Sequence, residues 1–177
     1  GLAVLPAERG THGAGGGRMK RVVATGTFDI LHPGHVYYLE ESRRLGDELY
    51  VIVARDKNVR HKPRPVIPEE QRARMVAALR PVDHAVLGDL HDMFRPIEEI
   101  RPAVITFGFN QHFEEEGIKR ELERRGLSVE LVRIGRYLGD PYCSSSGIVR
   151  QVLARCQHGP QSRESGLNDE HFGRNDP

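Results

Sequence analysis

The chain has 177 residues, which suffices for one domain with a buried core and is too short for two ordinary domains. Its 26 Lys and Arg residues nearly balance its 25 Asp and Glu residues, and a net charge of +1 excludes the broad basic surface that duplex nucleic acid requires. The apolar runs are far shorter than the roughly 20 residues of a membrane-spanning helix, so we expect neither nucleic acid nor a membrane as partner.

Both ends of the chain are polar. Gly, Ala and Arg are frequent in residues 1–18, and polar residues with Gly and Pro fill residues 157–177, so we expect a disordered leader, one domain over 19–156 and a disordered tail. Met19 directly precedes the first strand-like run, and we expect the natural chain to start there; a native mass that requires earlier residues would contradict this. Two cysteines and the absence of a secretory pattern indicate a reducing, cytoplasmic setting.

Strands and helices alternate through the predicted domain. Runs rich in Val, Ile and Leu predict strands over residues 21–25, 49–54, 82–87, 103–107 and 128–134. Apolar residues at helical spacing predict helices over residues 34–45, from 69 onward, 92–100, 113–125 and 145–155. In the last helix we expect one buried face, made of Ile148, Val149, Val152, Leu153 and Cys156. The alternation predicts an α/β fold, a doubly wound, Rossmann-like sheet of five parallel strands.

A ligand of such a sheet binds beyond the carboxyl ends of the strands, where the strand order reverses. The loop after the first strand is the most informative, because residues 26–35 read Gly-Thr-Phe-Asp-Ile-Leu-His-Pro-Gly-His. Gly34 lets backbone approach a ligand, and the amino end of the following helix favours an anion. His32 and His35 flank Gly34 and add donors that a nearby triphosphate would hold protonated. A metal pair or a helix cap with a surface residue is the alternative, but this setting favours a nucleotide phosphate site.

Two further groups of residues lie in the loops of the predicted sheet. Serines 144–146 open the last helix, where one serves as an ordinary N-cap, and with Arg150 they also make a second anion cradle. Six basic residues between 55 and 64 follow the second strand, either as a solvated face or as ligands of phosphate.

Residues 26–35 resemble the signature of the cytidylyltransferase-like nucleotidylyltransferase superfamily, whose mark is His-x-Gly-His. Within it the chain is most similar to the archaeal FAD synthetases (FMN adenylyltransferases), in three segments: Val53-Ala54-Arg55-Asp56, Pro68-Glu69-Glu70-Gln71-Arg72 and Tyr142-Cys143-Ser144-Ser145-Ser146. The resemblance implies transfer of AMP from ATP to FMN, a divalent cation such as Mg²⁺ that binds with ATP, and a homodimer. A glycerol-phosphate or ethanolamine-phosphate cytidylyltransferase is one alternative, and a non-catalytic nucleotide-binding regulatory module is another.

The resemblance also implies roles for individual residues. His32, His35 and Lys62 would serve the α-phosphate as catalytic residues. The remaining residues would bind the nucleotide: Thr27, Phe28, Asn110, Tyr137, Ser145, Ser146 and Arg150. Relatives usually carry an acid at the Asn110 position, where the loop touches base and ribose. We expect no metal ligand from the protein, and no residue marks a flavin pocket.

Overall fold

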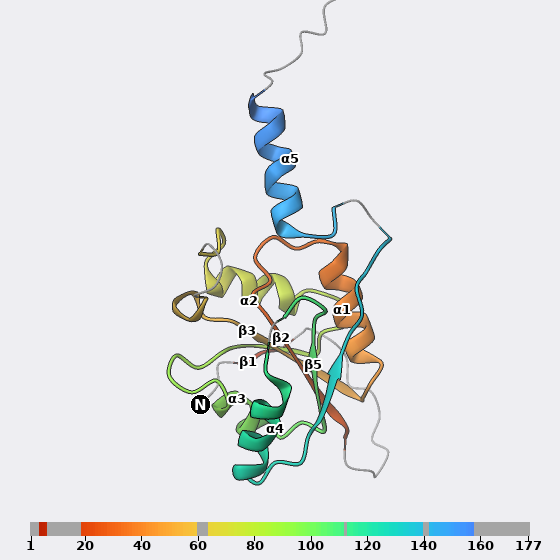
Figure 1. The fold of residues 1–177 in the computed structure, drawn as a ribbon, viewed down its shortest axis with the longest axis vertical. Coiled ribbons are helices and arrows are strands. Elements are labelled where there is room, and N and C mark those ends of the chain that lie inside the picture. The colour runs from red at the N-terminus through yellow and green to blue at the C-terminus, as the bar shows by residue number, and fades with distance from the viewer. Residues whose placement is uncertain (1–3, 7–18, 60–63, 112, 140–141, 158–177) are drawn as a thin grey trace, which may run out of the picture.

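The computed structural model describes residues 4–6, 19–59, 64–111, 113–139 and 142–157 (Figure 1). One six-stranded sheet has the order β1-β4-β3-β2-β5-β6. Its strands are β1 (Val4–Pro6), β2 (Arg21–Gly26), β3 (Glu48–Val53), β4 (His84–Leu87), β5 (Val104–Phe107) and β6 (Glu130–Arg133). Strands β2 to β6 pair in parallel, which confirms the predicted five-stranded parallel sheet.

Strand β1 is a described strand that the sequence did not predict. It pairs antiparallel with β4, with Leu5 opposite Ala85. The sequence predicts no structure for these three residues, which lie in the expected disordered leader. An edge strand such as β4 leaves backbone donors and acceptors unpaired, and a short extended segment satisfies them without any helical or alternating pattern of its own.

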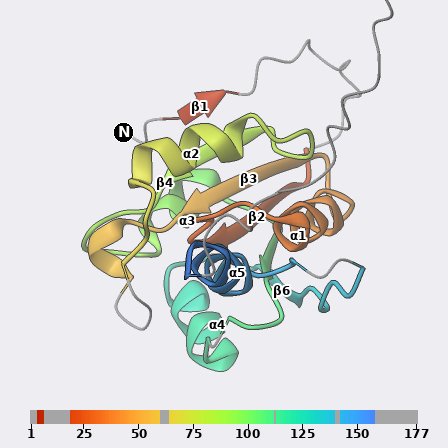
Figure 2. The same ribbon diagram turned by 90° about the horizontal axis from the view of Figure 1, so that it is seen from above.

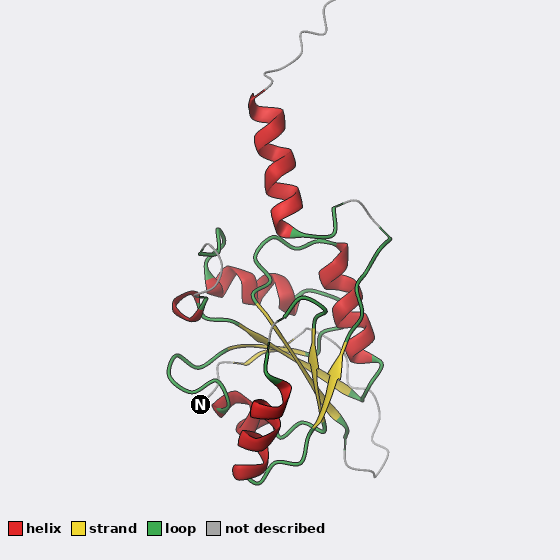
Figure 3. Cartoon of the chain, in the orientation of Figure 1, coloured by secondary structure: helices red, strands yellow, loops and turns green. Residues whose placement is uncertain are grey.

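Five α-helices and one 3₁₀ turn accompany the sheet in the described residues. They are α1 (Pro33–Arg43), the 3₁₀ turn η1 (Asp56–Asn58), α2 (Glu69–Ala77), α3 (Arg95–Ile100), α4 (Glu115–Arg124) and α5 (Ser145–Gln157) (Figure 3). Helices α1 and α2 cover one face, and α3 and α4 cover the other (Figure 2). In β2, Val22 and Ala24 join the first core while Val23 joins the second, as expected for a strand that is buried on both faces.

The strand order places the topological switch point between β2 and β5. From β2 the chain proceeds to β3 and β4 on one side, then crosses to β5 and β6 on the other. In open α/β sheets ligands bind at this point, beyond the carboxyl ends of the strands. The loops after Gly26 and Phe107 therefore flank the expected site.

Helix α5 contradicts the prediction of a buried face. It projects away from the sheet (Figure 1), and none of its residues is buried. The side chains of Val149, Val152 and Leu153 are 37%, 54% and 54% exposed, and Cys156 is exposed as well. The apolar spacing correctly predicted a helix with one apolar face. The prediction that the described chain covers this face was wrong, because periodicity does not say which surface a face meets.

Candidate active site

The loop between β2 and α1 folds around the side chain of Phe28. This residue has a left-handed backbone (φ 52°), and its ring is only 1% exposed. A Cβ atom at Gly26 would lie 2.7 Å from Cε2 of that ring, so the turn has no room for a side chain there. The ring packs against His35, with centroids 5.2 Å apart, and against Tyr38. Phe28 thus fixes the path of the loop and contacts one of the two predicted histidines.

His32 and His35 stack on one another at the start of α1. Their ring centroids are 3.8 Å apart and the rings are inclined by 22°. His32 occupies the N-cap position, and its carbonyl oxygen accepts a hydrogen bond from His35 N at 2.9 Å. Its Nδ1 atom is buried and has no hydrogen-bond partner among the described residues. Burial also lowers the pKa of His32 below its usual 6.5, which favours the neutral ring.

The serine turn before α5 lies against this loop. Ser145 Oγ donates a hydrogen bond to the carbonyl oxygen of Ile30 at 3.1 Å, and a Cβ atom at Gly34 would lie 3.0 Å from the carbonyl oxygen of Cys143. Ser144 Oγ accepts a hydrogen bond from Gly147 N at 3.2 Å, which makes it the cap of the helix. The two predicted anion sites therefore meet, and Gly34 allows the close approach.

The other predicted residues of α5 lie near this contact with exposed side chains. Ser146 occupies the first turn of α5. The Arg150 guanidinium lies back along the helix, since a Cβ atom at Gly147 would be 4.0 Å from its Nη2 atom. Both groups are free to meet a ligand that binds against the serine turn.

The remaining predicted residues are spread around the same edge of the sheet. Thr27 lies next to Phe28, and its carbonyl oxygen accepts a hydrogen bond from Arg72. Asn110 is exposed in the loop after β5, and the Tyr137 ring packs on Tyr37 of α1 with centroids 5.2 Å apart. Lys62 lies outside the described residues, so its role stays a prediction.

Arg72 is a residue of the site that the sequence did not reveal. Its side chain is fully buried, and it donates to the carbonyl oxygens of Ile67 at 2.9 Å and Ala54 at 2.8 Å, and to that of Thr27. It also forms an ion pair with Asp56 at 2.5 Å. One guanidinium therefore joins the signature loop, the end of β3 and the segment before α2. The sequence did offer one indication of this role: Arg72 lies four residues before Val76, on the apolar face of α2. An arginine that is buried there must have hydrogen-bonding or charged partners.

The segment before α2 is tied to the signature loop a second time. The carboxylate of Asp29 accepts hydrogen bonds from Val66 N at 3.1 Å and Ile67 N at 2.9 Å. Glu69 forms an ion pair with Arg55 at 2.8 Å, so this basic residue after β3 serves the fold. Of the predicted basic group, Lys57 and Arg64 are exposed and described.

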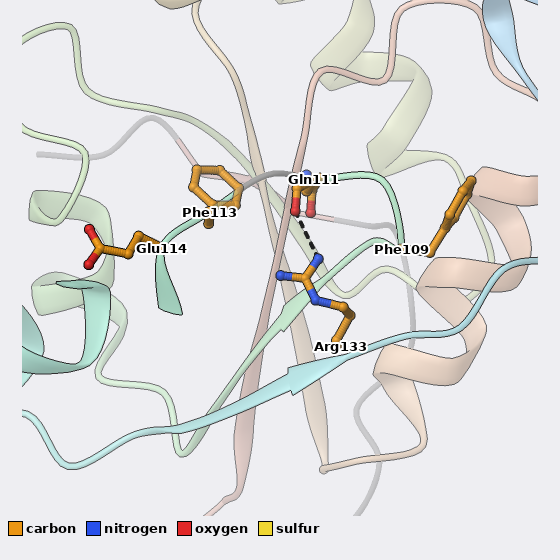
Figure 4. A pocket seen from close by; sticks show the side chains of 5 residues that line it. All are labelled: Phe109, Gln111, Phe113, Glu114 and Arg133. Atoms are coloured by element: carbon orange, nitrogen blue, oxygen red, sulfur yellow. Dashed lines mark hydrogen bonds between the residues drawn. The ribbon is translucent and has the colours of Figure 1, made fainter. Parts of the chain in front are cut away.

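A cavity of about 440 Å³ adjoins the loop that carries Asn110. It is lined by Phe109, Gln111, Phe113, Glu114 and Arg133 (Figure 4). Arg133 donates to the carbonyl oxygens of Gly108 at 3.1 Å and Gln111 at 2.8 Å, which holds this loop against β6. The two phenylalanine rings lie on opposite sides of the guanidinium (Figure 4). Sequence reasoning singled out the loop but not the hollow beside it.

Metal donors are not grouped in the described part of the chain: no three His, Cys, Asp or Glu residues lie together as a metal site there. Both cysteines are free thiols; Cys143 is partly buried and Cys156 is exposed. No described helix has the length and apolar character to cross a membrane.

Comparisons with known proteins agree with this geometry. The cytidylyltransferase-like family matches residues 23–152. A protein named FAD synthase from Methanoculleus marisnigri is 69% identical over 135 residues, which cover 76% of this chain and 90% of that one. Another FAD synthase, from Methanolacinia petrolearia, is 66% identical over 137 residues, 77% of this chain and 93% of its own. A solved structure described as a lipopolysaccharide core biosynthesis protein, from Thermoplasma volcanium, has a TM-score of 0.66 and 43% identity, and the match covers 68% of this chain and 100% of that one. The chain therefore belongs to the cytidylyltransferase-like family.

Proposed function

We propose that this chain is an FMN adenylyltransferase, which transfers AMP from ATP to FMN and releases FAD and pyrophosphate. Its similarity to two proteins named FAD synthase, at 66% and 69% identity over most of both chains, supports this choice of substrates. The observation that carries the chemistry is the stacked pair of His32 and His35, with the serine turn held against the same loop by Ser145.

The reaction is a displacement at phosphorus. A phosphate oxygen of FMN bonds to the α-phosphorus of ATP, and the bond from that phosphorus to the bridging oxygen breaks, so pyrophosphate leaves with the electron pair. A phosphate monoester is already anionic at neutral pH, and no general base is needed. The protein contributes positioning, worth up to about 7–11 kcal/mol in favourable cases, and donors aimed at the charge that develops on the phosphates.

We propose the following roles; that of Lys62 rests on the sequence alone, because this residue lies outside the described part of the chain. His32 and His35 donate to the α-phosphate, together with Lys62, and the nucleotide charge reverses the effect of burial on the pKa of His32. Thr27 and the Phe28 backbone place the triphosphate at the end of β2. The leaving pyrophosphate is held by the serine turn through Ser145, Ser146 and Arg150, while Asn110 and Tyr137 bind the nucleoside end.

We also propose a divalent cation as part of the reacting complex. No group of three His, Cys, Asp or Glu side chains forms a cage in the described chain, so the residues fit a cation that binds through ATP phosphate oxygens and water. Such a cation supplies charge neutralisation on the phosphates.

Two broader features complete the proposal. A cytoplasmic location agrees with the two free thiols. A homodimer agrees with the exposed apolar residues Val152 and Leu153 on α5, because solvent does not favour such a face. Sedimentation of the full chain as a monomer at micromolar concentration would contradict the dimer.

The experiment that tests the reaction uses labelled ATP or CTP with a panel of phosphate acceptors. We expect FAD only from ATP and FMN. Formation of CDP-glycerol or CDP-ethanolamine would assign the chain to a cytidylyltransferase reaction instead. No pyrophosphate from any pair would contradict nucleotidyl transfer and favour a non-catalytic nucleotide-binding module.

A further inference from the structure

The parallel strands of the sheet are joined past their ends by one extra backbone hydrogen bond at three of their interfaces. In each case the amide that follows the last residue of one strand donates to the last carbonyl of its neighbour. These bonds are Ala54 N to Gly26 O at 2.9 Å, Gly88 N to Val53 O at 2.9 Å and Ile134 N to Phe107 O at 2.8 Å. They hold β2 to β3, β3 to β4 and β5 to β6 up to the edge where the loops begin.

The interface between β2 and β5 ends differently. Its pairing stops at Ala24 and Thr106, one residue short of the end of β5. The next bond of a regular parallel ladder would run from Gly108 N to the carbonyl oxygen of Thr25. Instead Gly108 N donates to Oε1 of Gln111 at 2.7 Å, and Nε2 of Gln111 donates to the Thr25 carbonyl oxygen at 2.7 Å. The side-chain carboxamide of Gln111 thus replaces one backbone hydrogen bond. It accepts from the Gly108 amide and donates to the Thr25 carbonyl oxygen, so both backbone groups have a partner.

Two sets of contacts fix this carboxamide. Gln111 N donates to the carbonyl oxygen of Gly108 at 3.1 Å, which closes a turn that aims the side chain back at the strand ends. Arg133 donates to the Gly108 and Gln111 carbonyl oxygens and pins the turn to β6 (Figure 4). The Gln111 carboxamide is therefore held in a fixed place, and Gln111 also lines the cavity described above.

A second side chain, that of Tyr38, bridges β2 and β5 next to Gln111. The hydroxyl of Tyr38 accepts a hydrogen bond from Thr25 N at 3.1 Å and donates to the carbonyl oxygen of Thr106 at 2.8 Å. Burial raises the pKa of Tyr38 to about 12, so the hydroxyl keeps its proton at every pH of an assay. Two side chains in succession, the Tyr38 hydroxyl and the Gln111 carboxamide, therefore bridge β2 and β5 at the carboxyl ends of these strands.

We propose that Gln111 is a positioning residue that sets the width of the crevice between β2 and β5 for the nucleotide. The loops that leave these strands carry Thr27 and Asn110, which are assigned to the triphosphate and to the nucleoside end of ATP. The inference rests on that part of the proposed function. Without the carboxamide, Gly108 N can donate directly to the Thr25 carbonyl oxygen. The β2–β5 pairing then extends by one hydrogen bond, and the loops that follow Gly26 and Phe107 move closer together.

The main test is Gln111→Ala, with Gln71→Ala on the exposed surface of α2 as the matched control. We expect Gln111→Ala to lower kcat/KM for ATP by about 10- to 100-fold, the scale of a small misplacement of a substrate. The KM for FMN at saturating ATP and the melting temperature should stay close to those of the control. Wild-type KM and kcat for ATP in Gln111→Ala would overturn the inference.

Gln111→Glu separates positioning from general support of the fold. Its carboxylate still accepts from Gly108 N but has no proton for the Thr25 carbonyl oxygen. Because an ordinary glutamate stays ionised at neutral pH, the kcat/KM of this variant for ATP should fall as it does in Gln111→Ala, while its KM for FMN stays near the wild-type value. A Gln111→Glu enzyme with wild-type kcat/KM for ATP would overturn the inference. If the wild type makes no FAD, the proposed function fails, and the ATP dissociation constants of the same variants still decide the role of Gln111.

Discussion

The rings of His32 and His35 stack at a centroid distance of 3.8 Å where α1 begins. Two side chains of the same kind, one at the N-cap and one in the first turn, are aimed at the amino end of a helix, where backbone N–H groups already favour an anion. The ring of Phe28 packs against His35 and so helps to hold the pair in place. Under the proposed function this arrangement binds phosphate and stabilises its charge.

Replacing His35 removes a donor without disturbing the core. We expect His35→Ala to lower kcat at least ~100-fold, as the loss of a donor to transition-state charge does. The circular dichroism spectrum should be unchanged. His91→Ala, at an exposed position in the loop after β4, is the control. Turnover near that of the control would remove His35 from the catalytic set.

The lowered pKa of His32 makes the stability of the free protein depend on pH. The unfolded chain binds a proton at this ring near pH 6.5, while the folded protein binds it only at lower pH because the ring is partly buried. The stabilisation is therefore present above pH 6.5 and is lost as the pH falls toward the folded pKa. Urea unfolding at pH 7.5 and 5.5 should show a larger loss for wild type than for His32→Asn. Equal losses would show that His32 does not titrate in this way.

Arg72 allows a test of whether its buried guanidinium holds the signature loop, the end of β3 and the segment before α2 together. Arg72→Met leaves the carbonyl oxygens of Thr27 and Ala54 without their donor and Asp56 without its counter-charge. We expect the free energy of unfolding to fall by about 1–3 kcal/mol for each buried carbonyl oxygen left without a donor, whereas the Asp56 side chain is 39% exposed and can be solvated. Arg74→Met, on the exposed side of the same helix, should change it by less than about 0.5 kcal/mol. Similar unfolding free energies for the two variants would contradict this stabilising role of Arg72.

Gly26 is the position where the turn has least space. In Gly26→Ala the new Cβ atom would lie 2.7 Å from Cε2 of Phe28, a residue that is itself buried in the core. We expect a loss of about 1–3 kcal/mol in unfolding free energy, as for other overpacked sites, together with reduced turnover. Gly135→Ala is the matched control, since nothing lies within 4 Å of its added Cβ. Full stability and activity in Gly26→Ala would contradict the packing argument.

The sequence predicted the parallel strands and the turn that carries the proposed phosphate site, because both leave local patterns. Apolar runs mark strands such as β3, and the spacing of Gly34 with His32 and His35 marks the turn into α1. The apolar stripe of α5 is equally clear, but only the fold shows that the described chain leaves it uncovered. The short strand β1 carries no pattern, and its partner β4 supplies the reason for its conformation.

The roles of Arg72 and Gln111 escaped prediction for a related reason. Each acts through carbonyl oxygens of distant strands, such as Thr27 for Arg72 and Thr25 for Gln111. Backbone carbonyls are present at every residue, so the sequence cannot tell which of them a side chain will reach. Only the strand order brings these groups together.

The most direct measurement follows the phosphorus atoms of ATP. The chain is incubated with FMN and with ATP labelled at either the α or the γ position, and the products are separated. The account predicts that the α label appears in FAD and the γ label in pyrophosphate. Label from the γ position in a flavin product, or in free phosphate with ADP, would contradict nucleotidyl transfer by this chain.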